Sequence, residues 1–235
     1  MRNIIQSMDQ TDRIKYDYDL LEQKYLKIVN RKVDDTAVRD ELIDKLSGRT
    51  VVLIAPGRSS LAEQERIKAF AIEKNAVLIA VNAILPGYEY DYAFFVNPAR
   101  YEYASGVDSE GFKKVRKILL SNIKTKALDN EMVVAYDHAI KQGWPHFDNA
   151  VICALRLLDW LGIGEVSIAG FDGFKTRYNE SYADPQLPSL NPDNKWDELN
   201  EEIYSMFQEF KENAEHLRKI HFLTESYFDS SKASL

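Results

Sequence analysis

The sequence predicts an α/β protein: a Rossmann-like, mostly parallel sheet with helices on both faces, preceded by an N-terminal helical hairpin. Short runs of apolar, β-branched residues, typical of strands buried on both faces, recur along the chain from residue 49. Segments with apolar residues at helical spacing lie between several of these runs, and such alternation forms right-handed βαβ units. The length of 235 residues, 45% of them hydrophobic and 29% charged, suits one full domain with an appendage.

The first segment is expected to form a helical hairpin over residues 12–47. Residues 30–35 interrupt its helical pattern, and Gly48 follows the pattern as a helix stop. The apolar residues that recur at spacings of three and four are Ile14, Tyr18, Leu21, Tyr25, Ile28, Val38, Leu42 and Leu46. We therefore divide the chain into a helical lead-in, residues 1–48, and a Rossmann-like domain, residues 49–235.

Seven strands and three further helices are expected in the Rossmann-like domain. The first of these helices follows Ser60, which stands three residues before Glu63 in the spacing of a capping box, and runs to about residue 74. The second begins at Asp148 and stops at Gly162, and the third covers residues 196–217. The strands are expected at residues 49–55, 77–82, 92–97, 117–121, 131–136, 166–170 and 219–224. Residues 175–194 show no periodicity, and a loop of this length in a compact domain is usually functional or disordered.

Charge and composition narrow the classes of partner. The chain carries 30 Lys+Arg against 37 Asp+Glu, a net charge of −7, which argues against nucleic acid or an anionic membrane surface as the main partner. No apolar run reaches the roughly 18 residues of a membrane span, and the N-terminus lacks the apolar core of a secretory signal. Cys153 is the only cysteine, which excludes a disulfide framework and a cysteine-built zinc site. We expect a cytoplasmic protein with no metal site.

Polar residues follow several predicted strands, at the sheet edge where parallel sheets bind ligands. In an open α/β sheet, ligands bind at the carboxyl ends of the strands, near the point where the strand order reverses. Asn82 and Asn97 end two strands, and Asn122 lies just beyond a third. An asparagine amide offers a donor and an acceptor without charge, as needed to read a ribose or a base. Each asparagine can equally serve only the turn that follows a strand.

The loop after the first strand, residues 56–60, predicts an anion site. A turn at Gly57 and a helix N-terminus capped by serines would present free N–H groups and the positive end of the helix dipole. Arg58 could add a charge-assisted contact to a phosphate. The alternative is a plain β–α turn. The loop matches neither the Gly-rich dinucleotide fingerprint nor a Walker A loop, and Asn82 replaces the acidic residue that holds an NAD ribose, so NAD is disfavoured.

The sequence offers little for acid–base or nucleophilic catalysis. His146, just before the helix predicted at Asp148, is the one histidine that we would test as an acid or base, and its alternative role is a capping or loop contact. The chain has no Gly-x-Ser-x-Gly elbow. Cys153 falls within an apolar helix pattern, which favours packing in the core.

Several motifs together resemble a known family. They are VVLIAPGRSSL at residues 51–61, FFVNP at 94–98, SN at 121–122, DNAVICALR at 148–156 and IAGFDGF at 168–174. With these motifs the chain resembles bacterial CMP-sialic-acid-dependent sialyltransferases of glycosyltransferase family 42. The resemblance implies that the first loop approaches the phosphate and ribose of CMP, and that the asparagine-ended strands hold the nucleotide. The nucleotide-binding positions that it implies here are Gly57, Arg58, Ser59, Asn82, Asn97, Asp148, Asn149, Asp172 and Phe174.

The resemblance departs at the catalytic residue. The family places a catalytic histidine before the last long helix, and residues 187–196 contain none. Loss of such a general base costs about 10²–10⁴-fold in rate. No catalytic residue is therefore assigned, and nucleotide binding is expected with or without sugar transfer.

A second resemblance covers almost the whole chain. From Tyr25 through VDD at 33–35 into the APGRS loop at 55–59, the chain is similar to the C-terminal domain behind the barrel of HMG-CoA-lyase-type aldolases. Such proteins are often named 4-hydroxy-2-oxovalerate aldolases and occur in surface-polysaccharide gene sets. The chain has no room for the barrel, so aldolase activity is not implied for it.

Two main functions are expected from these patterns. The first is binding of a nucleotide or nucleotide-sugar of the CMP type, with no other cofactor, in a glycosyltransferase-like domain linked to surface-polysaccharide biosynthesis. The alternative is a non-catalytic accessory domain that tethers an aldolase barrel or a second copy of the chain through its N-terminal helices. Hydrolysis or pyrophosphoryl transfer on a nucleotide is a third, weaker expectation.

Overall fold

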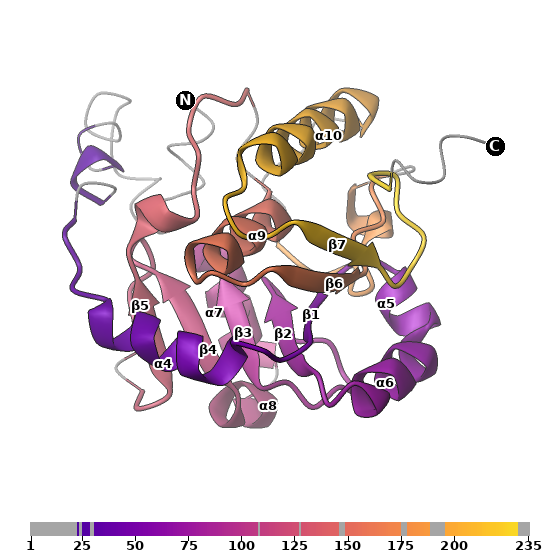
Figure 1. The fold of residues 1–235 in the computed structure, drawn as a ribbon, viewed down its shortest axis with the longest axis horizontal. Coiled ribbons are helices and arrows are strands. Elements are labelled where there is room, and N and C mark those ends of the chain that lie inside the picture. Colours follow the sequence, from indigo (N-terminus) through magenta and orange to yellow (C-terminus); the bar gives the residue numbers. More distant parts are fainter. Residues whose placement is uncertain are drawn as a thin grey trace.

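A single sheet organises the computed structural model, which describes residues 23, 25–28, 31–107, 109–126, 128–145, 149–174, 178–188 and 196–229. Its seven strands follow the order β5-β4-β3-β2-β1-β6-β7, and every neighbouring pair is parallel (Figure 1). The strands are β1 (Val51–Ile54), β2 (Val77–Val81), β3 (Tyr92–Phe95), β4 (Arg116–Leu120), β5 (Glu131–Val134), β6 (Glu165–Ala169) and β7 (Lys219–Phe222). The predicted α/β fold and all seven predicted strands are confirmed.

Helices cover both faces of the sheet, as predicted. Alternate residues of a strand point to opposite faces, so Val51 and Leu53 of β1 pack with α4, α9 and α10, whereas Val52 and Ile54 pack with α6. Helices α7 and α8 pack on the second face, against β3 and β4. The helices are α4 (Thr36–Leu46), α5 (Ser59–Ala62), α6 (Gln64–Glu73), α7 (Pro98–Val107), α8 (Ser109–Lys114), α9 (Ala150–Trp160) and α10 (Trp196–Asn213), with 3₁₀ turns η1 (Tyr136–His138) and η2 (Tyr178–Ser181).

The second helix of the predicted hairpin is present as α4, and its buried residues Leu42 and Leu46 belong to the main core. Of the first helix, Gln23 and residues 25–28 are helical, and Tyr25 is buried in the same core. The remaining residues of that prediction, up to residue 30, lie outside the described part of the chain.

Helices α7 and α8 were not expected from the sequence. The asparagine at position 97 and Pro98 after it are a strong helix-start signal, but we assigned Asn97 only to a strand end. Gly106 and Gly111 also weaken the helical pattern in this region.

The capping box predicted at Ser60 is wrong. The Ser60 hydroxyl is buried and donates to the Ala55 carbonyl over 2.5 Å, so it caps no helix. Helix α6 begins at Gln64, and its N-cap Glu63 makes no side-chain capping bond. The serine instead ties α5, in which it lies, to the residue that follows β1.

The strand order reverses between β1 and β6, and the backbones approach very closely there. Beyond the strand ends, the N–H groups of Ala55 and Gly57 donate to the carbonyls of Ala169 and Gly170 over 2.8 and 3.0 Å. A Cβ on Gly57 would lie 2.3 Å from the Gly170 oxygen, and a Cβ on Gly170 would lie 2.2 Å from the Ala55 oxygen. Gly170 also has a φ of +76°, so this close approach of the two backbones requires glycine at both positions.

Among the described residues, no helix combines the length and the apolar character needed to cross a membrane.

Gly170→Ala is expected to lower the free energy of unfolding by about 3 kcal/mol or more, because the clash with backbone adds to the strain of a positive φ. Gly162→Ala is the matched control, since Gly162 has a φ of +78° with nothing within 4 Å of an added Cβ, and it should lose about 1 kcal/mol. Urea denaturation of both variants measures the difference. Equal losses of unfolding free energy in the two variants would contradict the close approach of the backbones that follow β1 and β6.

Candidate functional site

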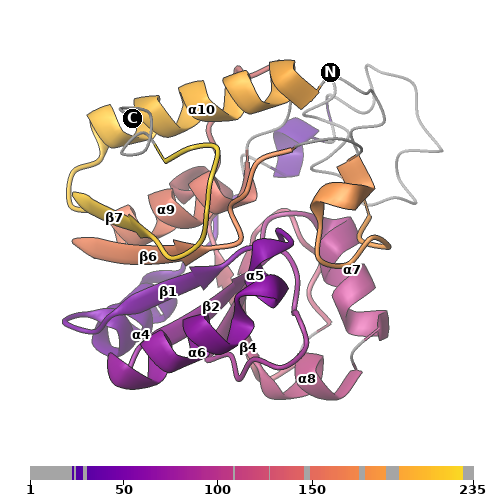
Figure 2. The ribbon, with the colours of Figure 1, turned by 90° about the vertical axis from the view of Figure 1, so that its right-hand side faces the viewer.

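A pocket opens at the carboxyl ends of β1, β2, β3 and β6, where the strand order reverses. Helix α9, the first turns of α10 and the segment 178–188 form its other walls, and this segment lies beside α7 on that side of the sheet (Figure 2). Its polar and aromatic lining comprises Asn82, Asn97, Arg100, Asn149, Phe171, Asp172, Phe174, Ser181, Tyr182 and Phe228. This is the position at which open α/β sheets bind ligands.

Asn82 and Asn97 line the pocket in a similar way. Asn82 has a φ of 57° after β2, and its side-chain oxygen accepts from the Val96 N–H over 2.9 Å. Asn97 follows β3, and its side-chain oxygen accepts from the N–H groups of Ala99 and Arg100 in the first turn of α7. Each asparagine thus has a structural role that uses its carbonyl oxygen. Neither NH₂ group donates a hydrogen bond to the described residues, which leaves two amide donors at the pocket.

Asn149 caps α9 at the pocket wall. Its side-chain oxygen accepts from the N–H groups of Val151 and Ile152 over 2.8 and 3.4 Å. Helix α9 therefore starts at Ala150, two residues later than predicted, and the predicted start and site residue Asp148 lies outside the described residues.

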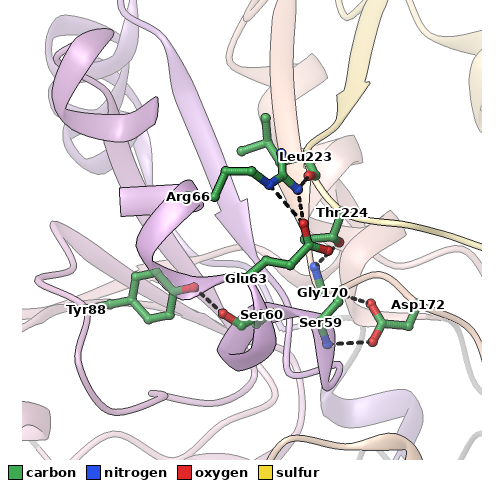
Figure 3. Close-up of polar contacts among 9 residues, drawn as sticks. All are labelled: Ser59, Ser60, Glu63, Arg66, Tyr88, Gly170, Asp172, Leu223 and Thr224. Carbon is green, nitrogen blue, oxygen red and sulfur yellow. Dashed lines mark hydrogen bonds and ion pairs between the residues drawn. The ribbon is translucent and has the colours of Figure 1, made fainter. Parts of the chain in front are cut away.

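The first loop does not form the anion site expected from the sequence. The Gly57 N–H donates to Gly170, and the Ser59 N–H donates to an Asp172 carboxylate oxygen over 2.9 Å. The Ser59 hydroxyl donates to the other carboxylate oxygen (Figure 3). A carboxylate of the protein thus occupies the place predicted for a phosphate, and Arg58 is exposed and does not line the pocket.

Further contacts around α5 hold together the segments that follow β2, β6 and β7. The Tyr88 hydroxyl donates to the Ser60 carbonyl, Arg66 donates to the Leu223 carbonyl, and the Gly170 N–H donates to the Thr224 hydroxyl over 3.0 Å (Figure 3). These partners follow β2, β7 and β6, respectively. The loop is therefore part of the rigid frame of the pocket.

Aromatic side chains form one wall. The rings of Tyr182 and Trp196 each lie 6.0 Å from the Phe174 ring, centroid to centroid. The buried side-chain amide of Asn200 makes two hydrogen bonds to the Phe174 backbone: it accepts from the N–H over 2.9 Å and donates to the carbonyl over 2.7 Å. This reciprocal pair fixes Phe174 at the pocket.

The segment 178–188 joins the first loop to α7. Tyr182 forms an antiparallel bridge with Gly57, and the Ala183 N–H donates to the Pro56 carbonyl over 2.8 Å. On the α7 side, the Tyr182 ring lies 4.7 Å from the Arg100 guanidinium. The neighbouring Tyr103 hydroxyl donates to Asp184 over 2.8 Å, and burial together with this carboxylate raises the pKa of Tyr103 to about 12.

The structure brings together six of the nine residues assigned to nucleotide binding. Those that line the pocket are Gly57, Asn82, Asn97, Asn149, Asp172 and Phe174. Arg58 and Ser59 do not line it, and Asp148 is not described.

Among the lining residues that sequence reasoning missed are Arg100 and Tyr182. Once Asn97-Pro98 is recognised as a helix start, Arg100 lies in the first turn of a helix, where the helix dipole makes a positive charge unfavourable. This unfavourable position could have indicated a functional role for Arg100. No local pattern marks Tyr182, since it reaches the pocket only through its pairing with Gly57.

The described histidines lie away from the pocket. His138 stacks on Trp160 at 3.9 Å and lies 3.3 Å from Asp35, while His216 and His221 do not line the pocket either. The candidate His146 lies outside the described residues. Within the described part of the chain, no three His, Cys, Asp or Glu residues are grouped so as to hold a metal ion. The ionisable residues that line the pocket there are Arg100, Asp172 and Tyr182.

No known protein family, curated protein or solved structure matches this chain. The function is therefore inferred from the pocket.

The contact between Ser59 and Asp172 is expected to stabilise the pocket frame before any ligand binds. Ser59→Ala and Asp172→Asn should each lower the free energy of unfolding by about 1–2 kcal/mol, because each weakens a partly buried hydrogen bond to a charged group. Urea denaturation of the two variants and their combination should give a coupling energy of about 1 kcal/mol. Ser205→Ala, whose hydroxyl binds only its own helix on an exposed face, serves as control and should cost less than 0.5 kcal/mol. Strictly additive losses would contradict the contact.

Proposed function

We propose that this chain binds a nucleotide or nucleotide-sugar of the CMP type in the pocket at the carboxyl end of its sheet. The observation that carries the proposal is the pair of amide NH₂ groups, on Asn82 and Asn97, that make no hydrogen bond to the described residues at the point where the strand order reverses.

The chemistry of the two amides favours cytosine. Cytosine presents adjacent acceptors at O2 and N3, whereas uracil presents an N–H donor at N3, so two amide donors match cytosine better. Because the side-chain oxygens of Asn82 and Asn97 are held by backbone N–H groups, the orientation of both amides is fixed. The Phe174 and Tyr182 rings supply an apolar surface on which a base or ribose could pack.

The proposal is one of binding, in a glycosyltransferase-like domain, and it assigns no catalytic residue. Asp172 is the carboxylate among the described lining residues, and its oxygens already accept two hydrogen bonds from Ser59. The resemblances to sialyltransferases and to the tail domain of aldolases remain predictions. A nucleotide-binding role gives hydrogen-bond partners to the NH₂ groups of Asn82 and Asn97, whereas a tethering role gives them none.

Titration calorimetry with CMP, UMP, AMP and cytidine tests the proposal. We expect CMP to bind more tightly than UMP by about 10-fold, the value of one hydrogen bond gained and one mismatch avoided. Absence of binding by all four compounds would overturn the proposal and leave the accessory-domain alternative.

Asn82→Asp and Asn97→Asp are expected to weaken CMP binding by about 10-fold each, since both variants lose an amide donor and gain a negative charge. Each keeps the oxygen that accepts from backbone, and aspartate is a good N-cap and tolerates a positive φ, so stability should change little.

Asn75→Asp is the matched control for this pair. Asn75 also has a positive φ, of 46°, but it is exposed between α6 and β2, outside the pocket. CMP affinity should be unchanged in this variant. An equal loss in all three variants would show that the effect is one of general charge and not of the two pocket donors.

A further inference from the structure

Arg100 is a buried cation whose guanidinium has no partner for its hydrogen bonds. The residue lies in the first turn of α7, only 5% of it is exposed, and it lines the pocket. Its guanidinium makes no hydrogen bond or ion pair with the described residues, and Nη1 is buried without an acceptor. Buried charges in proteins are normally paired, because removing an ion from water costs several kcal/mol.

The surroundings of Arg100 stabilise its charge only in part. The Tyr182 ring lies against the guanidinium at 4.7 Å, and a cation–π contact of this kind stabilises the positive charge. An aromatic face accepts none of the in-plane N–H groups, however, so the buried Nη1 has no acceptor among the described residues. The helix dipole of α7 adds a further unfavourable effect, because Arg100 lies at its positive end.

The carboxylates that could pair with Arg100 are bound elsewhere. Asp184 accepts from the Tyr103 hydroxyl and from the Gln186 N–H, and Asp172 accepts from Ser59. Neither forms an ion pair with Arg100. Both acids thus hydrogen-bond to other groups, while the guanidinium lies at the pocket wall without an ion pair to either.

We propose that Arg100 is the anion-binding residue of the pocket and takes the phosphate of the bound nucleotide. The planar fork of N–H donors on a guanidinium matches two phosphate oxygens. The Tyr182 ring lies 4.7 Å from this guanidinium and limits its movement at the pocket. This inference rests on the proposed function, because it assumes that the ligand in the pocket is a nucleotide. It also replaces Gly57 and Arg58 as the expected phosphate site, since the N–H groups of Gly57 and Ser59 donate within the protein and Arg58 does not line the pocket.

The experiment compares CMP with cytidine, which lacks the phosphate, in the full chain and in Arg100→Met. Calorimetry should show CMP binding at least 10-fold more tightly than cytidine to the unaltered chain, and this preference should be lost in Arg100→Met while cytidine binds as before. Arg58→Met removes an exposed arginine outside the pocket and should retain the preference. A preference that survives in Arg100→Met would overturn the inference and leave the proposed function intact.

Failure of the proposed function is distinguishable. If neither CMP nor cytidine binds, pyrophosphate is the probe: binding that Arg100→Met abolishes supports the anion site without a nucleotide, and no binding overturns it.

Stability measurements separate a binding role from a structural one. Because methionine keeps the apolar stem and removes an unpaired buried charge, thermal unfolding of ligand-free Arg100→Met should occur at or above the temperature of the unaltered chain. In the unaltered chain CMP should raise that temperature more than cytidine does, whereas in Arg100→Met the two ligands should raise it equally. If Arg100→Met does not fold, Arg100→Lys takes its place in the comparison of CMP with cytidine, because lysine keeps the positive charge without the planar guanidinium. It should lose most of the preference for CMP, and an unchanged preference would overturn the inference.

Discussion

The hydrogen bond from the Gly57 N–H to the Gly170 carbonyl determines the shape of the site. In open α/β sheets the strand ends diverge where the order reverses, and a ligand can enter between them. Here the pairing of β1 and β6 continues past both strands, so the crevice between their ends is filled by the protein's own backbone. The pocket consequently extends toward β2 and β3, where Asn82, Asn97 and Arg100 form its wall.

The same close approach of β1 and β6 explains why the Ser59 N–H is bound within the protein. With Gly57 held on Gly170, the chain after β6 turns so that Asp172 reaches Ser59, two residues beyond Gly57. Asp172 satisfies the N–H that a phosphate would otherwise take. The sheet therefore uses an internal carboxylate to hold its first turn, and the unpaired positive charge lies on the other side of the pocket, at α7.

What the sequence could predict follows from the range of the interactions. Strands buried on both faces read as continuous apolar runs such as residues 51–54, so each is recognisable without its neighbours. The strand ends then place Asn82 and Asn97 at one edge, which is why these two lining residues could be predicted. Ser59 and Asp172 are 113 residues apart in the sequence, and no local pattern reveals that the Ser59 N–H donates to the Asp172 carboxylate. The same holds for Tyr182, which pairs with Gly57 far away in the sequence, and for Arg100, which contacts the Tyr182 ring.

The net charge of −7 does not prevent the pocket from taking an anion. Helix α10 presents Leu199 and Ile203 to the pocket, whereas its carboxylates at Asp197, Glu198 and Glu201 are exposed. An exposed carboxylate about 10 Å from a ligand phosphate repels it by only about 0.4 kcal/mol in water, before salt screening. A guanidinium in contact at about 4 Å, in the lower effective dielectric near a protein surface, attracts it by about 4 kcal/mol before desolvation costs. One buried arginine therefore outweighs several distant surface acids, and burial rather than the overall charge decides what the pocket can bind.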